Sequence, residues 1–319
     1  MRVLVYGAGG VGLGLGSFLL TAGFRVYFVG RPDTVRALRE NGLTRSGRLG
    51  AATASPDAFG AATTLEELET APPFDLVLVT VKTTENAAVA ESLAAGLSGE
   101  PPLVLCQNGW GNTETFAPWF DDSRIWNARI ITGFVRPTPS HVNVTAHAEP
   151  VAVGHISGID PSLLEPLCDA LRRGGLPAEA TTRIAEILWA KLLYNGCLNA
   201  LGAILDVPYG ALGESAHTRQ VIAELASEIF AVMHRAGHVT RWPDPESFLK
   251  SLYGELLPPT RAHESSTLQD LRAGRRTEID ALNGAIVRLG RQFGIETPVN
   301  RTLCALIRTL ESRKDPADT

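Results

Sequence analysis

The first thirty residues constrain the fold most, because a short apolar segment runs directly into a glycine-rich turn. Residues 1–6 are mostly apolar, the turn reads GAGGVG over residues 7–12, and an apolar helical pattern follows to about residue 22. Residues 24–29 read as a second strand. A buried strand, a glycine turn, a helix and a second strand make one βαβ unit. This order predicts an α/β domain built on a parallel sheet that helices cover on both faces.

The glycine turn has the spacing of a phosphate-binding loop. The first glycine permits a tight turn, the second lets the backbone approach a pyrophosphate, and the third allows close packing of the helix. The start of the helix offers free N–H groups to the phosphates. Because the motif follows a strand and opens a helix, we favour a dinucleotide site over a glycine-rich turn without a ligand. The predicted loop residues are Gly7, Ala8, Gly9, Gly10, Val11 and Gly12.

The end of the second strand discriminates between the two nicotinamide dinucleotides. An NAD site usually places an acidic residue there to bind the ribose 2′-hydroxyl. This chain has Arg31 after Gly30, and its first acid is Asp33. An arginine can pair with the 2′-phosphate of NADP in a charge-assisted contact. We therefore predict NADPH/NADP⁺ as the cofactor. The alternative is that Arg31 is a solvated surface residue and Asp33 binds the ribose.

Two further apolar runs, residues 75–81 and 103–106, read as buried parallel strands. Polar residues follow both runs, where ligands of doubly wound sheets bind. Lys82 ends the first run and Asn108 follows the second, so we expect both to face the ligand rather than solvent or a simple turn. Residues 129–158 alternate in a way that suggests extra strands near the edge of the sheet.

From residue 184 the pattern is helical almost to the end. The predicted helices cover residues 184–204, 216–236, 265–273, 277–293 and 298–312, with a proline-rich break at 241–259. The fold class is therefore an N-terminal Rossmann (doubly wound) NADP-binding domain followed by an all-helical domain. We place the domains at residues 1–180 and 181–319.

The helix predicted over residues 184–204 carries a polar stripe. Lys191, Asn195 and Asn199 recur every four residues and share one face of an otherwise apolar helix. No acid stands three or four residues from Lys191, so an intrahelical ion pair does not explain it. This favours a polar cleft over a solvated helix face.

Two residues of the last third are further candidates. Ser266 with Gln269 has the spacing of a capping box, so its role is equally well structural or functional. Thr277 with Asp280 has the same spacing at the next helix. Glu278 lies beside that helix's apolar stripe and needs a partner, which is either the helix N-terminus or the polar cleft.

Composition excludes several classes of function. The formal net charge is −5 without a long run of one sign, which argues against a nucleic-acid or polybasic membrane surface. We find no apolar stretch long enough to span a membrane, and glycines interrupt the apolar N-terminus, unlike a signal peptide. The four cysteines lie far apart, so we predict reduced thiols in a cytoplasmic protein with no metal site. The apolar helical half leaves room for a homodimer contact.

Over nearly its whole length the chain resembles the ketopantoate reductases (2-dehydropantoate 2-reductases). The resemblance rests on GAGGVG, VTVKT, QNG, KLLYNGCLN and SSTLQDLRAGRRTEIDALNG, the last two being specific in combination. It implies NADPH-dependent reduction of a small anionic 2-keto acid to a 2-hydroxy acid, with ketopantoate as the first candidate.

The resemblance also implies roles for individual residues. Lys191 corresponds to the general acid, and Glu278 to a residue that contacts substrate and could orient the lysine. Arg31 corresponds to the arginine that recognises the 2′-phosphate, and Lys82 to a lysine near the nicotinamide. The residues that correspond to polar groups lining the substrate site are Asn108, Asn195, Asn199 and Ser266, of which Asn108 also faces the cofactor.

Two departures bear on the substrate. Tyr209 stands where well-known members of the family have a substrate-binding asparagine, and residues 131–145 lack the glycine-rich pattern common in that region. Two alternatives therefore stay open. One is a related dehydrogenase acting on another 2-keto or 2-hydroxy acid, and the other is a non-catalytic NADP-binding sensor.

Overall fold

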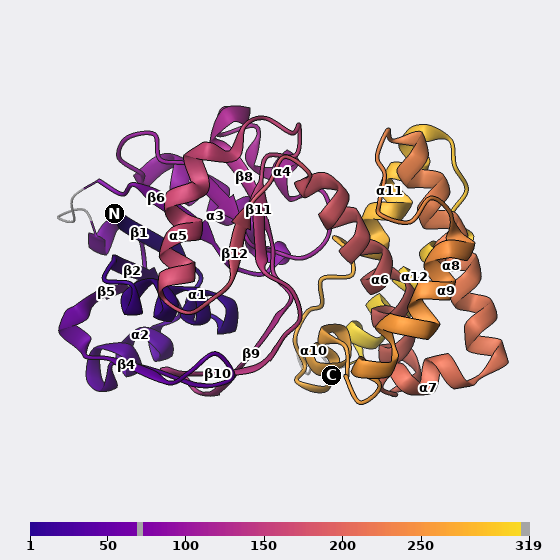
Figure 1. Cartoon of the computed structure of the whole chain (residues 1–319), viewed down its shortest axis with the longest axis horizontal. Coiled ribbons are helices and arrows are strands. Elements are labelled where there is room, and N and C mark those ends of the chain that lie inside the picture. The colour runs from indigo at the N-terminus through magenta and orange to yellow at the C-terminus, as the bar shows by residue number, and fades with distance from the viewer. Residues whose placement is uncertain (69–72, 314–319) are drawn as a thin grey trace. The chain divides into compact units, whose positions relative to one another are not determined.

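The computed structural model describes residues 1–68 and 73–313, and the chain divides into two compact units (Figure 1). The first unit comprises residues 1–107 and 112–185. The second comprises residues 108–111 and the chain from residue 186 onward. Residues 108–111 thus leave the unit that surrounds them in sequence and pack with the other one.

The first unit is built on an eight-stranded sheet with the order β12-β11-β8-β7-β6-β1-β2-β5. Neighbouring strands are parallel except for β8 and β11, which are antiparallel. The strand order reverses at β1, so the carboxyl ends of β1, β6 and β7 form the edge where doubly wound sheets bind ligands. The strands are β1 (Arg2–Tyr6), β2 (Arg25–Val29), β5 (Phe59–Ala62), β6 (Leu76–Val79), β7 (Leu103–Leu105), β8 (Ile125–Arg129), β11 (Val151–Gly154) and β12 (Ala178–Ala180).

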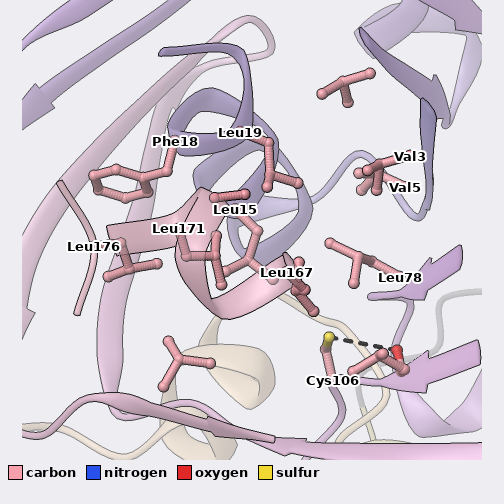
Figure 2. Close-up of a cluster of buried hydrophobic side chains, with 14 of the residues drawn as sticks. Val3, Val5, Leu15, Phe18, Leu19, Leu78, Cys106, Leu167, Leu171 and Leu176 are labelled. Carbon is pink, nitrogen blue, oxygen red and sulfur yellow. Dashed lines mark hydrogen bonds between the residues drawn. The ribbon is translucent and has the colours of Figure 1, made fainter. Parts of the chain in front are cut away.

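Helices cover both faces of this sheet, as the expected fold class requires. Val3 and Val5 of β1 belong to one apolar cluster, whereas Leu4 between them belongs to a second. Because successive side chains of a strand point to opposite faces, β1 is buried on both. Figure 2 shows part of the first cluster, to which α1 contributes Phe18, α5 contributes Leu171 and β1 contributes Val3 and Val5. The helices of this unit are α1 (Gly10–Thr21), α2 (Pro32–Asn41), α3 (Asn86–Gly96), α4 (Asn112–Phe116) and α5 (Glu165–Arg173).

A separate four-stranded sheet has the order β4-β3-β10-β9. Its strands are β3 (Leu43–Gly47), β4 (Ala52–Ala54), β9 (Thr132–Thr138) and β10 (His141–His147). Extra strands near the edge of the main sheet were expected over residues 129–158. The structure corrects this for β9 and β10, since β10 pairs in parallel with β3. Val142 and Val144 of β10 are buried in the same core as α1, which explains why the hairpin leaves the main sheet.

The described residues of the second unit form helices and no strand. The helices are α6 (Ile184–Leu205), which begins at the end of the first unit, α7 (Tyr209–Glu214), α8 (Ala216–Arg235), α9 (Pro245–Ser251), α10 (Ser266–Arg272), α11 (Asn283–Phe293) and α12 (Pro298–Ser312). Among the helices of the described residues, α6 alone is long and apolar enough to cross a membrane. Most of its apolar segment is buried inside the protein.

The second unit differs from expectation at α7 and α9, where no helix was predicted, and at the start of α11. The proline-rich break at 241–259 contains α9, whose first turn is capped by the side chain of Asp244. A proline at the first position of a helix is compatible with this cap because that N–H has no partner in the helix. The helix expected from residue 277 begins only at Asn283, after a turn over residues 278–282.

Candidate active site

The glycine loop at the end of β1 is fixed by backbone hydrogen bonds. The N–H groups of Gly7 and Ala8 both donate to the carbonyl of Val29, at 2.9 and 3.0 Å. Gly7 has a φ of +115°, and a Cβ there would lie 2.6 Å from the backbone nitrogen of Val81. The hydroxyl of Thr80 donates to the Gly7 carbonyl at 2.7 Å. The loop is therefore anchored to both neighbours of β1, and only glycine fits at its first position.

The other two motif glycines have opposite surroundings. A Cβ at Gly12 would overlap the Gly7 carbonyl oxygen, so this glycine is required by packing of α1 on the loop. A Cβ at Gly9 would meet nothing within 4 Å. Helix α1 begins at Gly10 without a side-chain cap. The N–H groups of its first turn can therefore serve an anion that approaches through the open space at Gly9.

The residues after β2 carry both basic and acidic groups. Arg31 is the N-cap of α2, its side chain is 80% exposed, and it lies 3.3 Å from the carboxylate of Glu85. Asp33, the alternative ribose ligand, pairs with Arg36 on the surface of α2. Asp33, the acid nearest to β2, thus already forms an ion pair on its own helix. This supports the prediction that the basic residue Arg31, and not an acid, binds the cofactor at the end of β2.

Polar residues follow β6 and β7, as expected. Lys82 is half-buried and stands just before the short helical turn at residues 83–85. Gln107, which sequence reasoning did not single out, is buried directly beyond β7, and its amide donates to Asn86 at 2.7 Å. Its carbonyl oxygen Oε1 is buried and has no hydrogen-bond partner among the described residues. The end of β7 therefore carries an unused acceptor in the first unit.

The second unit brings three of the predicted residues into one chain of hydrogen bonds. The Lys191 ammonium donates to Asn108 Oδ1 at 2.7 Å. Asn108 Nδ2 donates to Glu278 Oε2 at 2.9 Å. All three side chains are half-buried. One amide thus lies between an ammonium and a carboxylate, orienting both charged groups through charge-assisted bonds.

The segment 108–111 is held in the second unit by the turn that carries Glu278. Trp110 N donates to the Ala281 carbonyl at 2.9 Å, and its ring centroid lies 5.0 Å from that of Trp189 on α6. Gly109 has a φ of +85°, and a Cβ there would overlap the Ala281 carbonyl. The glycine of the QNG motif therefore lets Asn108 reach Lys191 and Glu278.

Glu278 is not on a helix, which corrects the expectation for this residue. Thr277 and Asp280 form no capping box, because the Thr277 hydroxyl accepts from Ile279 N and Asp280 pairs with Arg308 of α12. The Glu278 carboxylate lies in the turn before α11 and accepts from Asn108. The two partners expected for this carboxylate were a helix N-terminus and a polar cleft. In the structure it accepts from a polar side chain, the amide of Asn108.

The far end of the polar stripe on α6 is closed by an aromatic residue. Tyr209 Oη donates to Asn199 Oδ1 at 2.5 Å, and both side chains are buried. Burial raises the pKa of the Tyr209 phenol, so it remains a donor. Asn195, one turn before, is half-buried. Tyr209 therefore fills one of the two acceptor positions of the Asn199 amide oxygen.

The cap of α10 is Ser265 rather than Ser266. The Ser265 hydroxyl accepts from Leu268 N at 3.0 Å and donates to the Asn199 carbonyl at 3.1 Å. Ser266 is the first helical residue and is exposed. The capping box expected from Ser266 is therefore wrong by one residue, because the buried Ser265 is better placed to connect α10 with α6.

The described residues contain neither a metal-binding cluster nor a disulfide. They contain no cluster of three or more histidine, cysteine or acidic residues that could hold a metal ion. The four cysteines are buried and form no disulfide. Burial raises the pKa of the Cys106 thiol to about 12, which makes it a poor nucleophile at neutral pH.

The two halves of the chain match models of one protein family. The model described as "Ketopantoate reductase PanE/ApbA" matches residues 3–158, and that described as "Ketopantoate reductase PanE/ApbA C terminal" matches residues 183–311. Among curated relatives, a 2-dehydropantoate 2-reductase from Archaeoglobus fulgidus is 33% identical over 98% of each chain. Another, from Aquifex aeolicus, is 30% identical over 98% of this chain and 97% of the relative.

Solved structures agree with these matches. The crystal structure of a PanE/ApbA family ketopantoate reductase from Ralstonia eutropha has a TM-score of 0.85 and 30% identity, and the match covers 98% of this chain and 99% of that one. A ternary structure of D-mandelate dehydrogenase with NADH and anilino(oxo)acetate has a TM-score of 0.86 at 23% identity, covering 98% and 99%. The latter likeness shows a shared fold.

Proposed function

Because the chain belongs to the ketopantoate reductase family, we propose that it catalyses the NADPH-dependent reduction of a 2-keto acid to a 2-hydroxy acid. The first candidate substrate is 2-dehydropantoate, whose reduction to pantoate would serve pantothenate and coenzyme A biosynthesis. The observation that carries this proposal is the hydrogen-bonded chain of Lys191, Asn108 and Glu278 in the second unit.

The first unit fits a nicotinamide dinucleotide. The open space at Gly9 and the uncapped start of α1 suit a pyrophosphate, and the tight packing at Gly7 and Gly12 gives the loop its shape. Arg31 lies where a 2′-phosphate would be recognised, and Lys82 would serve the nicotinamide half. When bound, NADPH supplies the hydride that is added to the keto carbon.

Lys191 supplies the proton. Addition of a hydride to a ketone breaks the C=O π bond and leaves the electron pair on oxygen as an alkoxide. The ammonium stabilises this charge and donates a proton to the oxygen, so the product is a hydroxyl and a neutral amine. Asn108 orients Lys191 through its carbonyl oxygen.

The remaining polar residues would bind the substrate. Asn195 and Asn199 continue the stripe on α6, and Ser266 offers an exposed hydroxyl at the start of α10. One observation favours a second candidate, reduction of another 2-keto acid. Tyr209 donates to Asn199 Oδ1 and fills one of the two lone-pair positions of this oxygen, so a substrate hydroxyl that donated there would have to share the oxygen with the phenol. A 2-keto acid without a terminal hydroxyl suits this arrangement.

The test is to follow NADPH absorbance with purified protein and a panel of 2-keto acids that includes 2-dehydropantoate, 2-oxoisovalerate and phenylglyoxylate. Turnover on 2-dehydropantoate supports the first candidate, and turnover only on the others supports the second. Tight NADPH binding without turnover on any acid would instead indicate a dinucleotide-binding sensor. The Lys191→Ala variant should lose about 10²-fold in kcat while it retains NADPH affinity.

A further inference from the structure

Arg136 of β9 connects the two segments that surround the carboxyl end of β2. Its Nη1 donates to the Ala8 carbonyl in the glycine loop at 3.0 Å. Its Nη2 donates to the Thr34 hydroxyl in the first turn of α2 at 3.1 Å. Ala8 and Arg136 are 128 residues apart in sequence, so this contact exists only because β9 belongs to the separate sheet.

The position of β9 over the loop is fixed by α1. A Cβ at Gly10 would lie 2.8 Å from the Phe134 carbonyl oxygen, and a Cβ at Gly14 would overlap the Phe134 ring. These glycines of α1 therefore admit β9 to the side of the helix, while the space at Gly9 stays open. Arg136, two residues after Phe134, is held next to the loop without covering Gly9.

The charge of Arg136 is not balanced by a carboxylate of the described residues. Both of its hydrogen bonds go to neutral oxygens. A guanidinium carries five N–H donors, so these bonds leave three. Arg136 bonds to Thr34 in the first turn of α2, the helix whose N-cap is Arg31, so both arginines belong to the same end of β2. Burial and the positive charge of Arg31 hold the pKa of Arg136 below its ordinary value.

The acids nearby do not compensate for this pair. Among the described residues, Arg31 pairs with Glu85 in an exposed ion pair of the kind that contributes little free energy. Asp33 pairs with Arg36. Two like charges at the end of β2, one of them half-buried, favour an anion with more than one negative charge.

We propose that Arg136 binds the 2′-phosphate of NADPH together with Arg31, so that β9 determines cofactor choice. The proposal rests on the cofactor assigned above. The bond to Thr34 places the guanidinium at the end of β2, where the adenosine ribose of a dinucleotide lies, rather than at the start of α1, where the pyrophosphate binds. Arg136 is thereby a second determinant of the preference for NADPH, and the segment 131–145 has a function in the site.

The experiment compares Arg136→Gln and Arg136→Lys with Arg48→Gln as a matched control. Arg48 is an exposed arginine of the same unit, and it follows β3 in the same small sheet. Dissociation constants are measured by titration calorimetry for NADPH, NADH, adenosine 2′,5′-bisphosphate and 5′-AMP. The last two differ in the 2′-phosphate alone. Thermal melting establishes that each variant is folded.

We expect Arg136→Gln to weaken NADPH and adenosine 2′,5′-bisphosphate by about tenfold or more, since a charge-assisted bond to phosphate is lost. NADH and 5′-AMP should bind within about twofold of the unmodified protein, Arg136→Lys should recover part of the loss, and Arg48→Gln should change nothing. Equal weakening of all four ligands would overturn the proposal, because it would assign Arg136 to the pyrophosphate or to loop structure. Unchanged binding of all four by Arg136→Gln would also overturn it.

The proposed cofactor is tested separately by the unmodified protein. If that protein binds NADH as tightly as NADPH, the assignment of NADPH fails and this proposal fails with it. If it prefers NADPH and Arg136→Gln keeps the same preference, only the role of Arg136 is refuted.

Discussion

Replacement of Asn108 by alanine removes the bridge between Lys191 and Glu278 without touching either charged group. The side-chain amide makes one bond to the ammonium at 2.7 Å and one to the carboxylate at 2.9 Å. A hydrogen bond to a charged group is worth about 1.5–3 kcal/mol. If the orientation of Lys191 is realised in the transition state, losing one such bond lowers kcat by about 10- to 100-fold.

The assay measures kcat and KM for the keto acid, the dissociation constant of NADPH, and Tm. We expect kcat to fall in Asn108→Ala. Asn108→Asp keeps an acceptor for Lys191 but places a second carboxylate beside Glu278, so the KM of the anionic substrate should rise.

Asn300 supplies a matched control because it has the same chemistry in a structural place. Its amide donates to Glu228 at 2.7 Å and accepts from Asn283 at 2.9 Å, and it is fully buried. Asn300→Ala should lower Tm and leave the kcat of the folded protein within about twofold, since about 1–3 kcal/mol of buried hydrogen bonding is lost. A kcat for Asn108→Ala within twofold of the unmodified protein would refute the orienting role of this amide.

Three further predictions follow from the geometry. Gly9→Ala should leave Tm unchanged and weaken NADPH binding, because its Cβ meets open space that the pyrophosphate would fill, whereas Gly12→Ala should lower Tm as well, because its Cβ overlaps the Gly7 carbonyl; calorimetry and thermal melting separate the two. Tyr209→Phe should destabilise the protein by about 1–3 kcal/mol in urea unfolding, because it leaves Asn199 Oδ1 buried without a donor, and unchanged stability would contradict this. The four cysteines should react with a thiol reagent at pH 8 only after denaturation, because burial raises the pKa of two of them to about 12 and so keeps them protonated in the folded protein; rapid labelling of the native protein would be the contrary result.

The parts of the fold that follow local rules could be predicted from sequence. The strand, glycine loop and helix of the first thirty residues have the bounds that periodicity indicates, and α6, α8, α10 and α12 lie within one or two residues of expectation. Each has a long apolar stripe or a clear boundary signal, so local pattern and tertiary packing agree.

Long-range pairing could not be predicted. Residues 132–147 have the composition of strands, but only the parallel pairing of β10 with β3 assigns them to a second sheet. The contact of Arg136 with Ala8 therefore could not be predicted from the residues that surround either of them in sequence. The start of α11 was predicted too early because the apolar stripe continues through the turn before the helix. The Glu278 carboxylate in that turn is bound by the Asn108 side chain and not by a helix N-terminus of its own.

The candidate site shows the same division. The stripe of Lys191, Asn195 and Asn199 is a periodic feature and could be recognised on α6. The bridge by Asn108 depends on a four-residue segment that packs with the other unit of the chain. The contacts of Asn108 with Lys191 and Glu278 could not be predicted because these residues are far apart in sequence. The glycine at position 109 indicated only that a turn is present there.

The central claim, hydride transfer from NADPH to a 2-keto acid, is tested most directly by isotope transfer. The protein is incubated with NADPH that carries deuterium at the transferred position of C4 and with 2-dehydropantoate or the preferred keto acid of the panel, and the product is examined by mass spectrometry. The account predicts a 2-hydroxy acid with a single deuterium on C2, formed by the unmodified protein and formed about 10²-fold more slowly by Lys191→Ala. Product without deuterium, or deuterated cofactor that remains unconsumed with every acid, would contradict it.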